Sequence, residues 1–519
     1  MSESITPLLP NARYSDPQQV LETVFGYPSF RPGQRAIIDA VLAGRDCIGV
    51  LPTGAGKSLT YQLPAKILPG AVLVISPLIS LMKDQVDALV RLGFRATVLN
   101  STIDFEERRR RLGELRRGEI ELLYVAPEGL EGGLRALVAE CNVSLVVVDE
   151  AHCISHWGHD FRPSYRRLAG LKAELGDIPV LAVTATATRR VAGDIIRQLG
   201  MKQPAGYKGS FFRPNLVITA VRKGAAAGGA PRRDTRSDIL GVIRRHAGES
   251  GIVYCLSRRS VEGLAEWLGA RCVKAAPYHA GLADRDRARN QEAFARDEVD
   301  VVVATVAFGM GIDKSNVRYV IHRDMPKSVE SYYQEIGRAG RDGLPSDCVL
   351  FYSWADVMGY ETFLDGIDDP EVREETRRKT IEMFRLVDNG GCRHQRLVAY
   401  LDETIGPCGT NCDVCLERGI ESLLATTRRV RGAGDPVGAA RGAEPSEGDA
   451  ERFEALRALR KRIADGEGVP AYIVFSDAVL RQMAERRPRT RGEMLALSGV
   501  GPVKYDRYGE AFLRALREA

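Results

Sequence analysis

The feature that most constrains the fold is the alternation of short apolar runs with longer amphipathic stretches over the first 350 residues. Runs of Val, Ile and Leu that are bounded by loops and separated by helix-length segments are typical of strands buried on both faces of a parallel sheet. The pattern therefore predicts an α/β fold. The predicted strands are Asp46–Leu51, Ala71–Ser76, Glu121–Ala126, Ser144–Asp149, Ile178–Thr184, Gly251–Cys255, Asp300–Thr305 and Val317–His322.

The number of strands predicts more than one domain, because about 350 residues are long for a single sheet core. The sequence then becomes helical, contains a cluster of cysteines, passes through a stretch rich in Gly, Ala and Pro with a linker composition, and ends in a second helical block. The predicted boundaries are 15–208 and 209–350 for two α/β domains, 351–418 for the cysteine-containing domain, 419–449 for the linker and 450–519 for the C-terminal helical domain.

Composition excludes several classes of protein. The 519 residues are 44% hydrophobic and 27% charged, which argues against a wholly disordered chain. The net charge of +5 is too small to establish a polyanionic partner by itself. No apolar run approaches the 18 residues of a membrane span, and the first residues lack the pattern of a secretory signal. We therefore expect a cytoplasmic protein.

A glycine-containing loop is the first motif with a clear chemistry. Residues 53–58 read Thr-Gly-Ala-Gly-Lys-Ser and lie between an apolar run and a helical stretch. Backbone N–H groups of such a loop cradle phosphates, while Lys57 would reach the β- and γ-phosphates and the Ser58 hydroxyl would bind Mg²⁺. Leu51 replaces the first glycine of the strict motif, and an isolated glycine turn is the alternative interpretation. The predicted ATP-binding residues here are Thr53, Gly54, Gly56, Lys57 and Ser58.

A pair of carboxylates completes the ATPase chemistry. Asp149 and Glu150 close an apolar strand about 90 residues after the loop, within the sequence Asp-Glu-Ala-His. Asp149 is predicted to hold Mg²⁺, and Glu150 to orient or deprotonate the attacking water. Such a tetrapeptide also occurs by chance in acidic loops, but the preceding phosphate loop makes chance a poor explanation.

Two arginines in the second α/β domain are predicted to act on the γ-phosphate. The sequence Gln-Glu-Ile-Gly-Arg-Ala-Gly-Arg-Asp-Gly spans 334–343, with Gln334, Arg338 and Arg341 as candidate catalytic residues. Arginine beside the γ-phosphate stabilises charge on the equatorial oxygens in the transition state. ATP would then lie between two domains. The alternative for an isolated pair of arginines is an ordinary basic helix surface.

Four cysteines within 24 residues predict a structural zinc site. Cys392, Cys408, Cys412 and Cys415 would supply four thiolates in a tetrahedron with no open position. His394 is a possible ligand, but four cysteines already fill the site. The alternative is a set of reduced thiols without metal, as expected for the six other cysteines, which are scattered singly.

These motifs together resemble superfamily 2 helicases, and more closely the RecQ family of DNA helicases. The resemblance begins with residues 25–34, Phe-Gly-Tyr-Pro-Ser-Phe-Arg-Pro-Gly-Gln. It implies that Tyr27 and Arg31 flank the adenine ring and that Gln34 hydrogen-bonds its edge, which suits an aromatic face, a guanidinium plane and an amide. A hydrophobic staple before a helix is the alternative for this segment alone.

A second matching segment, Cys153–Tyr165, resembles the aromatic-rich loop with which RecQ proteins sense single-stranded DNA. The resemblance implies that Trp157 and Phe161 stack on bases and that Arg162 meets phosphate. His156 stands where the family is expected to have glutamine. A buried Trp–Phe cluster is the alternative.

Further segments match the family in order. Ser76–Gln85 and Asn100–Ser101 resemble DNA-contact segments, Thr184–Thr188 the coupling motif, and Phe212–Leu216 and Tyr278–Leu282 segments of the second domain. Thr305–Asp313 resembles the motif that touches both DNA and nucleotide. The resemblance thus adds Asn100, Ser101 and Thr305 as DNA contacts and Asp313 as a nucleotide contact.

The two C-terminal regions also have family counterparts. The cysteines resemble the RecQ zinc-binding domain, with one extra residue between Cys408 and Cys412. Residues 450–519 resemble the helicase-and-RNase-D C-terminal (HRDC) domain, in which Tyr472 would stack on a base and Lys504 would meet phosphate. The stretch 498–509 is predicted to be a hairpin-type turn between helices. A helical bundle without DNA contacts is the alternative.

The clearest departure from the family is an absence. RecQ helicases commonly carry a winged helix of roughly 100 residues between these two regions, whereas 416–449 provides 34 residues of a composition that cannot fold one. The resemblance otherwise implies two RecA-like parallel-sheet domains, then a small helical zinc-binding domain and an all-α HRDC-like domain.

The implied activity is ATP-dependent 3′→5′ unwinding of DNA in recombination and repair, with ATP, Mg²⁺ and Zn²⁺ as cofactors. The implied partners are single-stranded and partially duplex DNA, with single-stranded-DNA-binding and recombination proteins, at the nucleoid. The alternatives are a DNA-stimulated translocase that displaces proteins without efficient unwinding, and a non-hydrolysing DNA-binding adaptor. RNA is the alternative substrate, and the aromatic-rich loop and the zinc domain favour DNA.

Overall fold

The computed structural model describes residues 14–77, 79–100, 103–130, 133–155, 157–158, 160–224, 233–306, 308, 314–364, 369–424 and 447–518. The chain divides into two compact units. The first extends to Ser210 and includes Ser498–Arg507, and the second comprises Phe211–Leu497 with the residues from Tyr508 onward. None of the helices in the described part of the chain combines the length and the apolarity needed to span a lipid bilayer.

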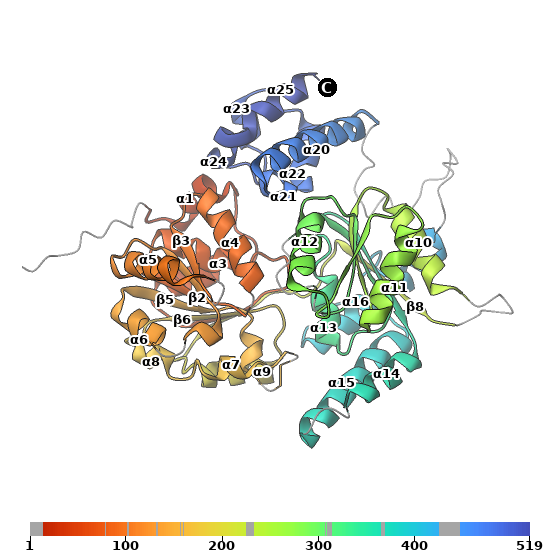
Figure 1. Ribbon diagram of the computed structural model, residues 1–519, viewed down its shortest axis with the longest axis horizontal. Helices are drawn as coiled ribbons and strands as arrows, with labels where there is room; N and C mark the ends of the chain where they lie inside the picture. The colour runs from red at the N-terminus through yellow and green to blue at the C-terminus, as the bar shows by residue number, and fades with distance from the viewer. Residues whose placement is uncertain are drawn as a thin grey trace, which may run out of the picture. The chain divides into compact units, whose positions relative to one another are not determined.

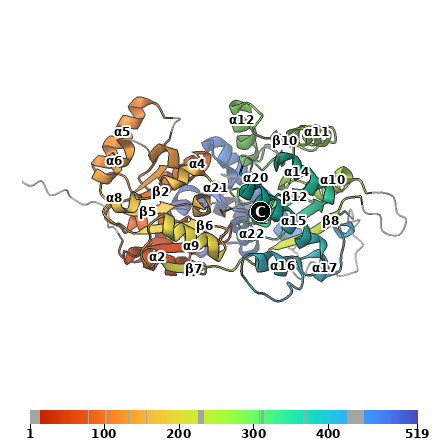
Figure 2. The same ribbon diagram turned by 90° about the horizontal axis from the view of Figure 1, so that it is seen from below.

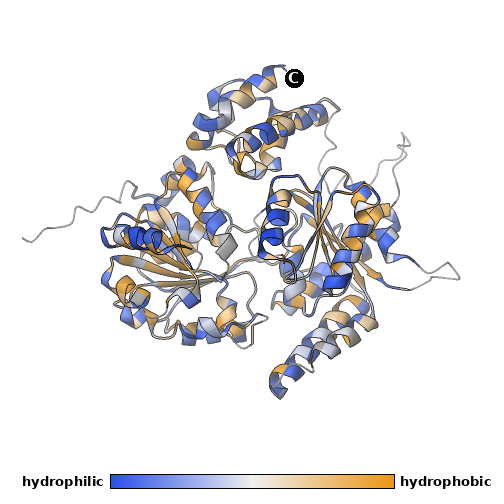
Figure 3. Cartoon of the chain, in the orientation of Figure 1, coloured by the Kyte–Doolittle hydropathy of each residue, from blue (hydrophilic) through white to orange (hydrophobic). Residues whose placement is uncertain are grey.

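The first unit is built on a seven-stranded parallel sheet with the order β3-β4-β2-β5-β6-β1-β7 (Figure 1). Its strands β1, β2, β4 and β6 are buried at every residue, which explains why they are continuous apolar runs. Figure 3 shows the same strands in the colours of apolar residues. The strands are β1 Cys47–Val50, β2 Ala71–Ile75, β3 Ala96–Leu99, β4 Leu122–Val125, β5 Val143–Val148, β6 Val180–Thr184 and β7 Ala205–Lys208.

Helices cover both faces of this sheet. On one face, Ile37 of α2, Leu59 of α3 and Met82 of α4 pack against strand residues such as Val72 and Val147. Figure 1 shows α4 on one side of the sheet and α6 and α8 on the other. The helices are α1 Pro17–Val20, α2 Gln34–Leu42, α3 Leu59–Gln62, α4 Ile79–Arg91, α5 Phe105–Arg116, α6 Gly133–Glu140, α7 Pro163–Arg166, α8 Leu171–Glu174 and α9 Arg189–Gln198, with shorter turns at Leu21–Phe25, Pro64–Lys66, Pro127–Leu130 and Ala151–Ile154.

The second unit contains a six-stranded parallel sheet with the order β10-β11-β9-β12-β13-β8. Its helices α10 and α11 pack on one face, and Figure 1 shows α12 and α13 on the other. The elements are β8 Leu216–Arg222, α10 Thr235–Arg245, β9 Ser250–Tyr254, α11 Arg258–Gly269, β10 Ala275–Tyr278, α12 Asp284–Ala295, β11 Val301–Ala304, β12 Val317–His322, α13 Val329–Ile336 and β13 Ser346–Tyr352.

Helices follow this sheet to the end of the chain. Helix α14 packs against α15, and α16 and α17 lie next to the edge strand β8 (Figure 2). The last helices form a bundle in which α20 packs against α21, α22 and α25. These elements are α14 Trp354–Leu364, α15 Pro370–Asp388, α16 Arg393–Tyr400, α17 Asp413–Leu416, α18 Glu421–Leu424, α20 Glu447–Glu467, α21 Ala471–Val474, α22 Asp477–Arg486, α23 Arg491–Leu495, α24 Pro502–Lys504 and α25 Glu510–Glu518.

The predicted architecture of two parallel sheets followed by helical regions is confirmed. All eight predicted strands are present, with ends within two residues of the predicted ones. The prediction of a hairpin-type turn over 498–509 was wrong in its second half. Residues Pro502–Lys504 are helical and Tyr505–Gly509 form a π-helical turn that leads into α25, with Tyr505 and Tyr508 buried. The glycines at 499 and 501 suggested a turn, but the aromatic residues after them pack as part of a helix.

Candidate ATPase and DNA-sensing site

The phosphate-loop candidate lies between β1 and α3. Gly54 and Gly56 have φ angles of +84° and +78°, a region that residues with a Cβ rarely adopt. A Cβ on Gly56 would also lie 2.5 Å from Nε2 of Gln34. Both glycines are therefore required by the shape of the loop. Lys57 and Ser58 follow them and are half-buried, as is Thr53 before them.

The segment predicted to bind adenine is tied to this loop. Gln34 is buried, and its Nε2 donates hydrogen bonds to the carbonyl oxygens of Ala55 at 3.2 Å and Gly56 at 3.0 Å. Its Oε1 accepts a hydrogen bond from the backbone N–H of Arg31 at 2.8 Å, and the Arg31 guanidinium donates to the carbonyl of Gly54. The side chain predicted to contact the base therefore also restrains the loop that would hold the phosphates.

Tyr27 precedes Arg31 and Gln34 in the sequence, and its side chain is 39% exposed. An exposed aromatic ring is compatible with the predicted stacking on adenine. The adenine contacts themselves stay a prediction.

Asp149 and Glu150 directly follow β5. Burial raises the pKa of Asp149 to about 7, the adjacent Glu150 carboxylate acts in the same direction, and Lys57 acts in the opposite direction. The Asp149 charge is thus buried close to the phosphate-loop lysine but only partly compensated by it. A divalent cation would supply the missing positive charge, so the donor set of Asp149 and the Ser58 hydroxyl fits Mg²⁺.

Glu150 has a strained backbone. Its φ is +47°, which a residue with a side chain adopts rarely and mostly where function requires it. Its backbone N–H donates to Oδ1 of Asp149 at 2.9 Å, and the hydroxyl of Tyr165 donates to the Asp149 carbonyl at 2.9 Å. These contacts hold the two carboxylates in a fixed relation at the end of the strand.

His152 connects the carboxylates with the predicted coupling motif. Its Nδ1 lies 2.9 Å from the hydroxyl of Thr184 and 3.4 Å from Oε2 of Glu150. Burial lowers the pKa of His152 to about 4, so the ring is neutral near pH 7. Thr184 begins the Thr-Ala-Thr-Ala-Thr segment, and its hydroxyl also donates to the carbonyl of Thr186 at 3.2 Å. Hydrogen bonds thus join neutral His152 to this segment, and the Glu150 carboxylate lies beside the ring.

The predicted aromatic-rich loop follows the carboxylates without a break. Trp157 is 38% exposed, and the guanidinium of Arg190 covers its ring, with Cζ 3.2 Å from the ring centroid. Arg190 belongs to α9, which begins immediately after the coupling segment. The sequence did not single out Arg190. Its position two residues after the last threonine of the motif was the available signal.

The other candidates in this loop are only partly exposed. Arg162 donates through Nε and Nη2 to Oδ2 of Asp160, both at 3.1 Å, and through Nη1 to the carbonyl of Pro77 at 3.3 Å. Phe161 is half-buried beneath Arg166, whose Cζ lies 5.7 Å from the ring centroid. The alternative of a buried Trp–Phe cluster is wrong, since Trp157 is exposed and Phe161 is half-buried.

The arginine candidates lie in the second unit, at the end of α13. Gln334 is half-buried on the helix, and Arg338 and Arg341 lie in the loop that follows. Arg338 is buried close to Tyr254. Burial raises the pKa of Tyr254 to about 12, and the positive charge of Arg338 acts against this rise. Arg338 therefore lies within the structure rather than on an exposed basic helix, and Arg341 is half-buried.

The remaining DNA candidates differ in accessibility. Asn100 is buried at the end of β3, whereas Thr305 after β11, Tyr472 in α21 and Lys504 in α24 are half-buried. Because the Asn100 side chain is buried, it would contact DNA only if the residues around it moved. Three residues of the predictions lie outside the described residues, namely Ser101, His156 and Asp313.

The four cysteines are brought together as predicted. The Sγ atoms of Cys392, Cys408, Cys412 and Cys415 all lie within 4.8 Å of one another. Sulfur atoms bound at about 2.3 Å to one tetrahedral Zn²⁺ are roughly 3.8 Å apart, so the cluster fits zinc. Backbone N–H groups also point at the sulfurs, with Cys408 N 3.2 Å from Cys392 Sγ and Cys415 N 3.5 Å from Cys412 Sγ. Such bonds favour thiolates.

His394 is not among these ligands. It is buried, and its Nε2 lies 3.0 Å from the carbonyl oxygens of Leu216 and Asn411. Asn411 in turn accepts a hydrogen bond from the backbone N–H of Ile218 at 3.0 Å. His394 therefore joins the zinc module to the edge strand β8, which the sequence did not indicate.

Four family profiles match the chain in succession. The DEAD/DEAH box helicase profile matches residues 31–195, and the helicase conserved C-terminal domain profile matches 234–343. The RecQ zinc-binding profile matches 354–416 and the HRDC domain profile matches 449–516. The first two profiles indicate an ATP-hydrolysing helicase.

Relatives resemble the chain over nearly its whole length. The ATP-dependent DNA helicase RecQ of Pasteurella multocida is 39% identical over 599 aligned positions, which cover 96% of this chain and 93% of the relative. The protein of the same name from Bacillus subtilis is 36% identical, with coverage of 96% and 98%. Because the first alignment has more positions than the 519 residues of this chain, that relative contains stretches without a counterpart here.

Solved structures share the fold at low identity. Saccharomyces cerevisiae Dbp5 bound to RNA and ADP BeF3 is 14% identical, with a TM-score of 0.53 and coverage of 71% of this chain and 98% of that one. The Mycobacterium smegmatis helicase Lhr bound to single-stranded DNA and AMP-PNP is 18% identical, with a TM-score of 0.54 and coverage of 92% and 74%.

Proposed function

Because this chain belongs to the RecQ family of helicases, we propose that it couples ATP hydrolysis to 3′→5′ translocation along single-stranded DNA and unwinds duplexes during recombination and repair. The direction and the pathway are taken from the family. The observation that carries the ATPase part is the pair of adjacent carboxylates at the end of β5, half-buried Glu150 and buried Asp149, the latter within electrostatic reach of Lys57.

Each of the candidate residues has its own role in the proposed ATP hydrolysis. Lys57 would bind the β- and γ-phosphates, while Ser58 and Asp149 would hold Mg²⁺, which would neutralise charge on the phosphates. Glu150 orients the attacking water. Arg338 and Arg341, with Gln334 on the preceding helix, stabilise the charge on the transferring phosphoryl group.

DNA binding is coupled to this chemistry by position. The aromatic-rich loop begins three residues after Glu150, and the coupling segment touches both His152 and, through Arg190, the ring of Trp157. A base that stacks on Trp157 therefore changes a contact next to the coupling segment. Partly exposed aromatic rings beside arginine suit single-stranded DNA because stacking tolerates any base.

The zinc site has a structural role in this proposal. Four cysteines fill the tetrahedron and leave no open position for a substrate. Zinc would fix the module that packs on β8, and the bound metal takes no part in hydrolysis. A DNA substrate would also place the protein at the nucleoid, with single-stranded-DNA-binding and recombination proteins as candidate partners.

ATP hydrolysis with and without single-stranded DNA tests the proposal. Lys57→Ala should lower DNA-stimulated turnover at least a hundredfold, because the lysine contacts the phosphates on which charge develops. Lys202→Ala is the matched control, since Lys202 is an exposed lysine of the same unit that pairs with Asp177. Equal turnover of the two variants would refute the site assignment, and turnover independent of DNA would refute the coupling.

A translocase that displaces bound proteins without unwinding is the second candidate. Only 34 residues separate the cysteine cluster from the HRDC region, and the Pasteurella relative contains stretches with no counterpart here. A missing strand-separating element would leave the motor intact. The adaptor alternative is disfavoured because Lys57, Asp149, Glu150 and Arg341 are all present.

A further inference from the structure

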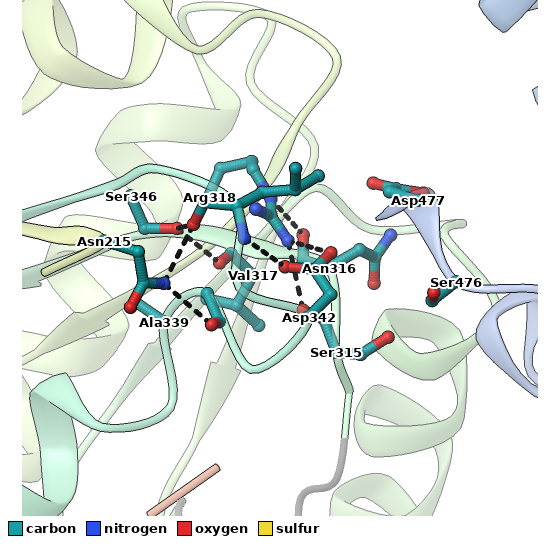
Figure 4. Close-up of polar contacts among 12 residues, drawn as sticks. Asn215, Ser315, Asn316, Val317, Arg318, Ala339, Asp342, Ser346, Ser476 and Asp477 are labelled. Carbon is teal, nitrogen blue, oxygen red and sulfur yellow. Dashed lines mark hydrogen bonds and ion pairs between the residues drawn. The ribbon is translucent and has the colours of Figure 1, made fainter. Parts of the chain in front are cut away.

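The loop 337–344 follows α13 and carries the two arginines of the proposed ATPase. It is held by side chains that have no part in the reaction, from the segment before β8 and from β12 (Figure 4). We propose that Asn215 and Arg318 are positioning residues that fix the backbone of this loop and so present its arginines in one orientation. The inference deepens the proposed function and rests on its assignment of Arg338 and Arg341.

Asn215 closes the turn that contains Arg341. Its Nδ2 donates to the carbonyl oxygens of Gly340 at 2.9 Å and Leu344 at 3.0 Å, so both amide hydrogens are used on the two ends of one turn. Its own carbonyl accepts a hydrogen bond from the backbone N–H of Ser346 at 2.9 Å. The turn therefore cannot open without breaking these bonds.

Arg213 fixes the orientation of that amide. Its Nε lies 3.2 Å from Oδ1 of Asn215, and this contact distinguishes the amide oxygen from the nitrogen. Its Nη2 donates to the carbonyl oxygens of Gly340 at 2.8 Å and Ala339 at 3.2 Å. Two residues of the Phe212–Leu216 segment, Arg213 and Asn215, thus hold the loop, and we call this pair the first brace. The segment thereby gains a function.

The close approach of Asn215 requires glycine at position 340. Gly340 has a φ of +56°, and a Cβ there would lie 2.4 Å from Nδ2 of Asn215 and 2.7 Å from the carbonyl oxygen of Leu344. The Gly340 N–H donates to the carbonyl of Val317 at 2.9 Å, at the start of β12. The loop backbone is thus bonded to the sheet directly as well.

Arg318 fixes the residue after Arg341. Its Nη2 donates to Oδ2 of Asp342 at 2.6 Å and to the carbonyl of Ser315 at 3.0 Å. The Arg318 and Asp342 side chains are 4% and 1% exposed. Burial raises the pKa of Asp342, and Arg318 acts against this rise. A buried pair of this kind adds little net stability but allows few alternative geometries.

Together the bonds from Arg213, Asn215 and Arg318 restrain the backbone on both sides of Arg341. Backbone motion of the loop is restricted at 339–340 and again at 342–344, which leaves mainly side-chain rotation for the arginine itself. Donors held in place before the reaction contribute more to transition-state stabilisation than donors that must be ordered during it. A displacement of about 1 Å can cost on the order of a hundredfold in rate.

Asn215→Ala is the first test. It should lower kcat of DNA-stimulated ATP hydrolysis by about tenfold to a hundredfold, while KM for ATP and the affinity for a fluorescent non-hydrolysable ATP analogue change by less than about twofold. Asn290→Ala is the matched control, because Asn290 in α12 also donates its amide to a backbone carbonyl, that of Pro277 at 2.8 Å. An unchanged kcat in Asn215→Ala would overturn the inference.

A double-mutant cycle with Arg341→Ala separates the inference from the proposed function. If Asn215 acts through the arginine, Asn215→Ala should have little further effect on kcat once Arg341 is alanine. A full, multiplicative loss in that background would contradict positioning. If Arg341→Ala alone left kcat unchanged, the assignment of the arginine in the proposed function would fail instead.

The second brace, the ion pair of Arg318 and Asp342, can be replaced by a pair of residues that should keep the fold. Replacing the buried ion pair by apolar residues in Arg318→Met/Asp342→Leu is expected to preserve the thermal midpoint within a few degrees. It should nevertheless lower kcat about tenfold or more at unchanged KM. A variant with the wild-type melting temperature and the wild-type kcat would refute the role of Arg318.

Discussion

Nε2 of Gln34 lies 3.0 Å from the carbonyl oxygen of Gly56, and the same nitrogen donates to Ala55, so the amide that the family resemblance assigns to adenine is bonded to the phosphate loop. Nucleotide base and phosphate loop are therefore connected through one buried side chain. This connection predicts that the loss of the amide affects more than the choice of base.

Gln34→Glu tests that connection. The replacement keeps the size of the side chain but removes both amide donors and faces two carbonyl oxygens with a carboxylate. We expect KM to rise by about tenfold or more for both ATP and GTP, because the loop itself is disturbed. A rise for ATP alone would show that Gln34 reads the base without supporting the loop. Steady-state kinetics with the two nucleotides decides between them.

Arg190 covers one face of the Trp157 ring. A base that stacks on this face must displace the guanidinium, at the cost of a cation–π contact of about 0.5 to 2 kcal/mol. Arg190→Ala should therefore tighten binding of a short fluorescent oligo-dT by roughly threefold to tenfold.

The ATPase of the same variant should need less DNA for half-maximal stimulation. Arg197→Ala on the same helix is the control, since Arg197 pairs with Asp194 and has no contact with the tryptophan among the described interactions. Weaker binding in Arg190→Ala would instead mean that Arg190 contacts the DNA phosphates and does not act as a cover.

Different side chains are expected to bind zinc and to dock the zinc module on β8. Cys408→Ser should lose the single equivalent of zinc, as measured by release to a chromogenic chelator, and should lower the melting temperature. His394→Gln should retain one zinc per chain, because His394 hydrogen-bonds Leu216 and Asn411 rather than the metal. Loss of zinc from His394→Gln would contradict the four-cysteine site.

His246 predicts a pH-dependent stability of the second unit. Burial alone would lower its pKa, but hydrogen bonds to Asp347 at 2.9 Å and Glu249 at 2.6 Å raise it to about 9. A raised pKa means that the contribution is complete below the unfolded value of about 6.5 and is lost as the pH rises through 9. The loss is on the order of 3 kcal/mol.

Thermal melting between pH 6.5 and 9.5 measures this dependence. The wild-type midpoint should fall over that range, and His246→Gln should be less stable at pH 6.5 and nearly independent of pH above it. An equal slope in both proteins would mean that other groups carry the pH dependence.

The sequence predicted the elements whose physical cause is local. Strands such as β2 and β6 are buried on both faces and must be apolar throughout, so their ranges could be read directly. The phosphate-loop glycines have positive φ angles and the four cysteines have metal-ligand spacing, which are equally local signals. The association of the four Sγ atoms follows from that spacing.

Contacts between distant segments could not be predicted in the same way. Arg190 covers Trp157 from another helix, and Asn215 reaches Gly340 across more than one hundred residues. The matched motif around Asn215 showed that the segment belonged to the family but not what it touched. From the sequence His394 is a possible metal ligand, because its position near the cysteines does not show that its ring hydrogen-bonds backbone carbonyls.

The most direct test of the central claim is unwinding of a duplex with a 3′ single-stranded tail, with ATP hydrolysis followed in the same tube. Duplexes with a 5′ tail and with blunt ends are the controls. The account predicts strand separation only with ATP and the 3′ tail, accompanied by DNA-stimulated hydrolysis. Hydrolysis stimulated by the tail without strand separation would contradict it and would identify the protein as a translocase.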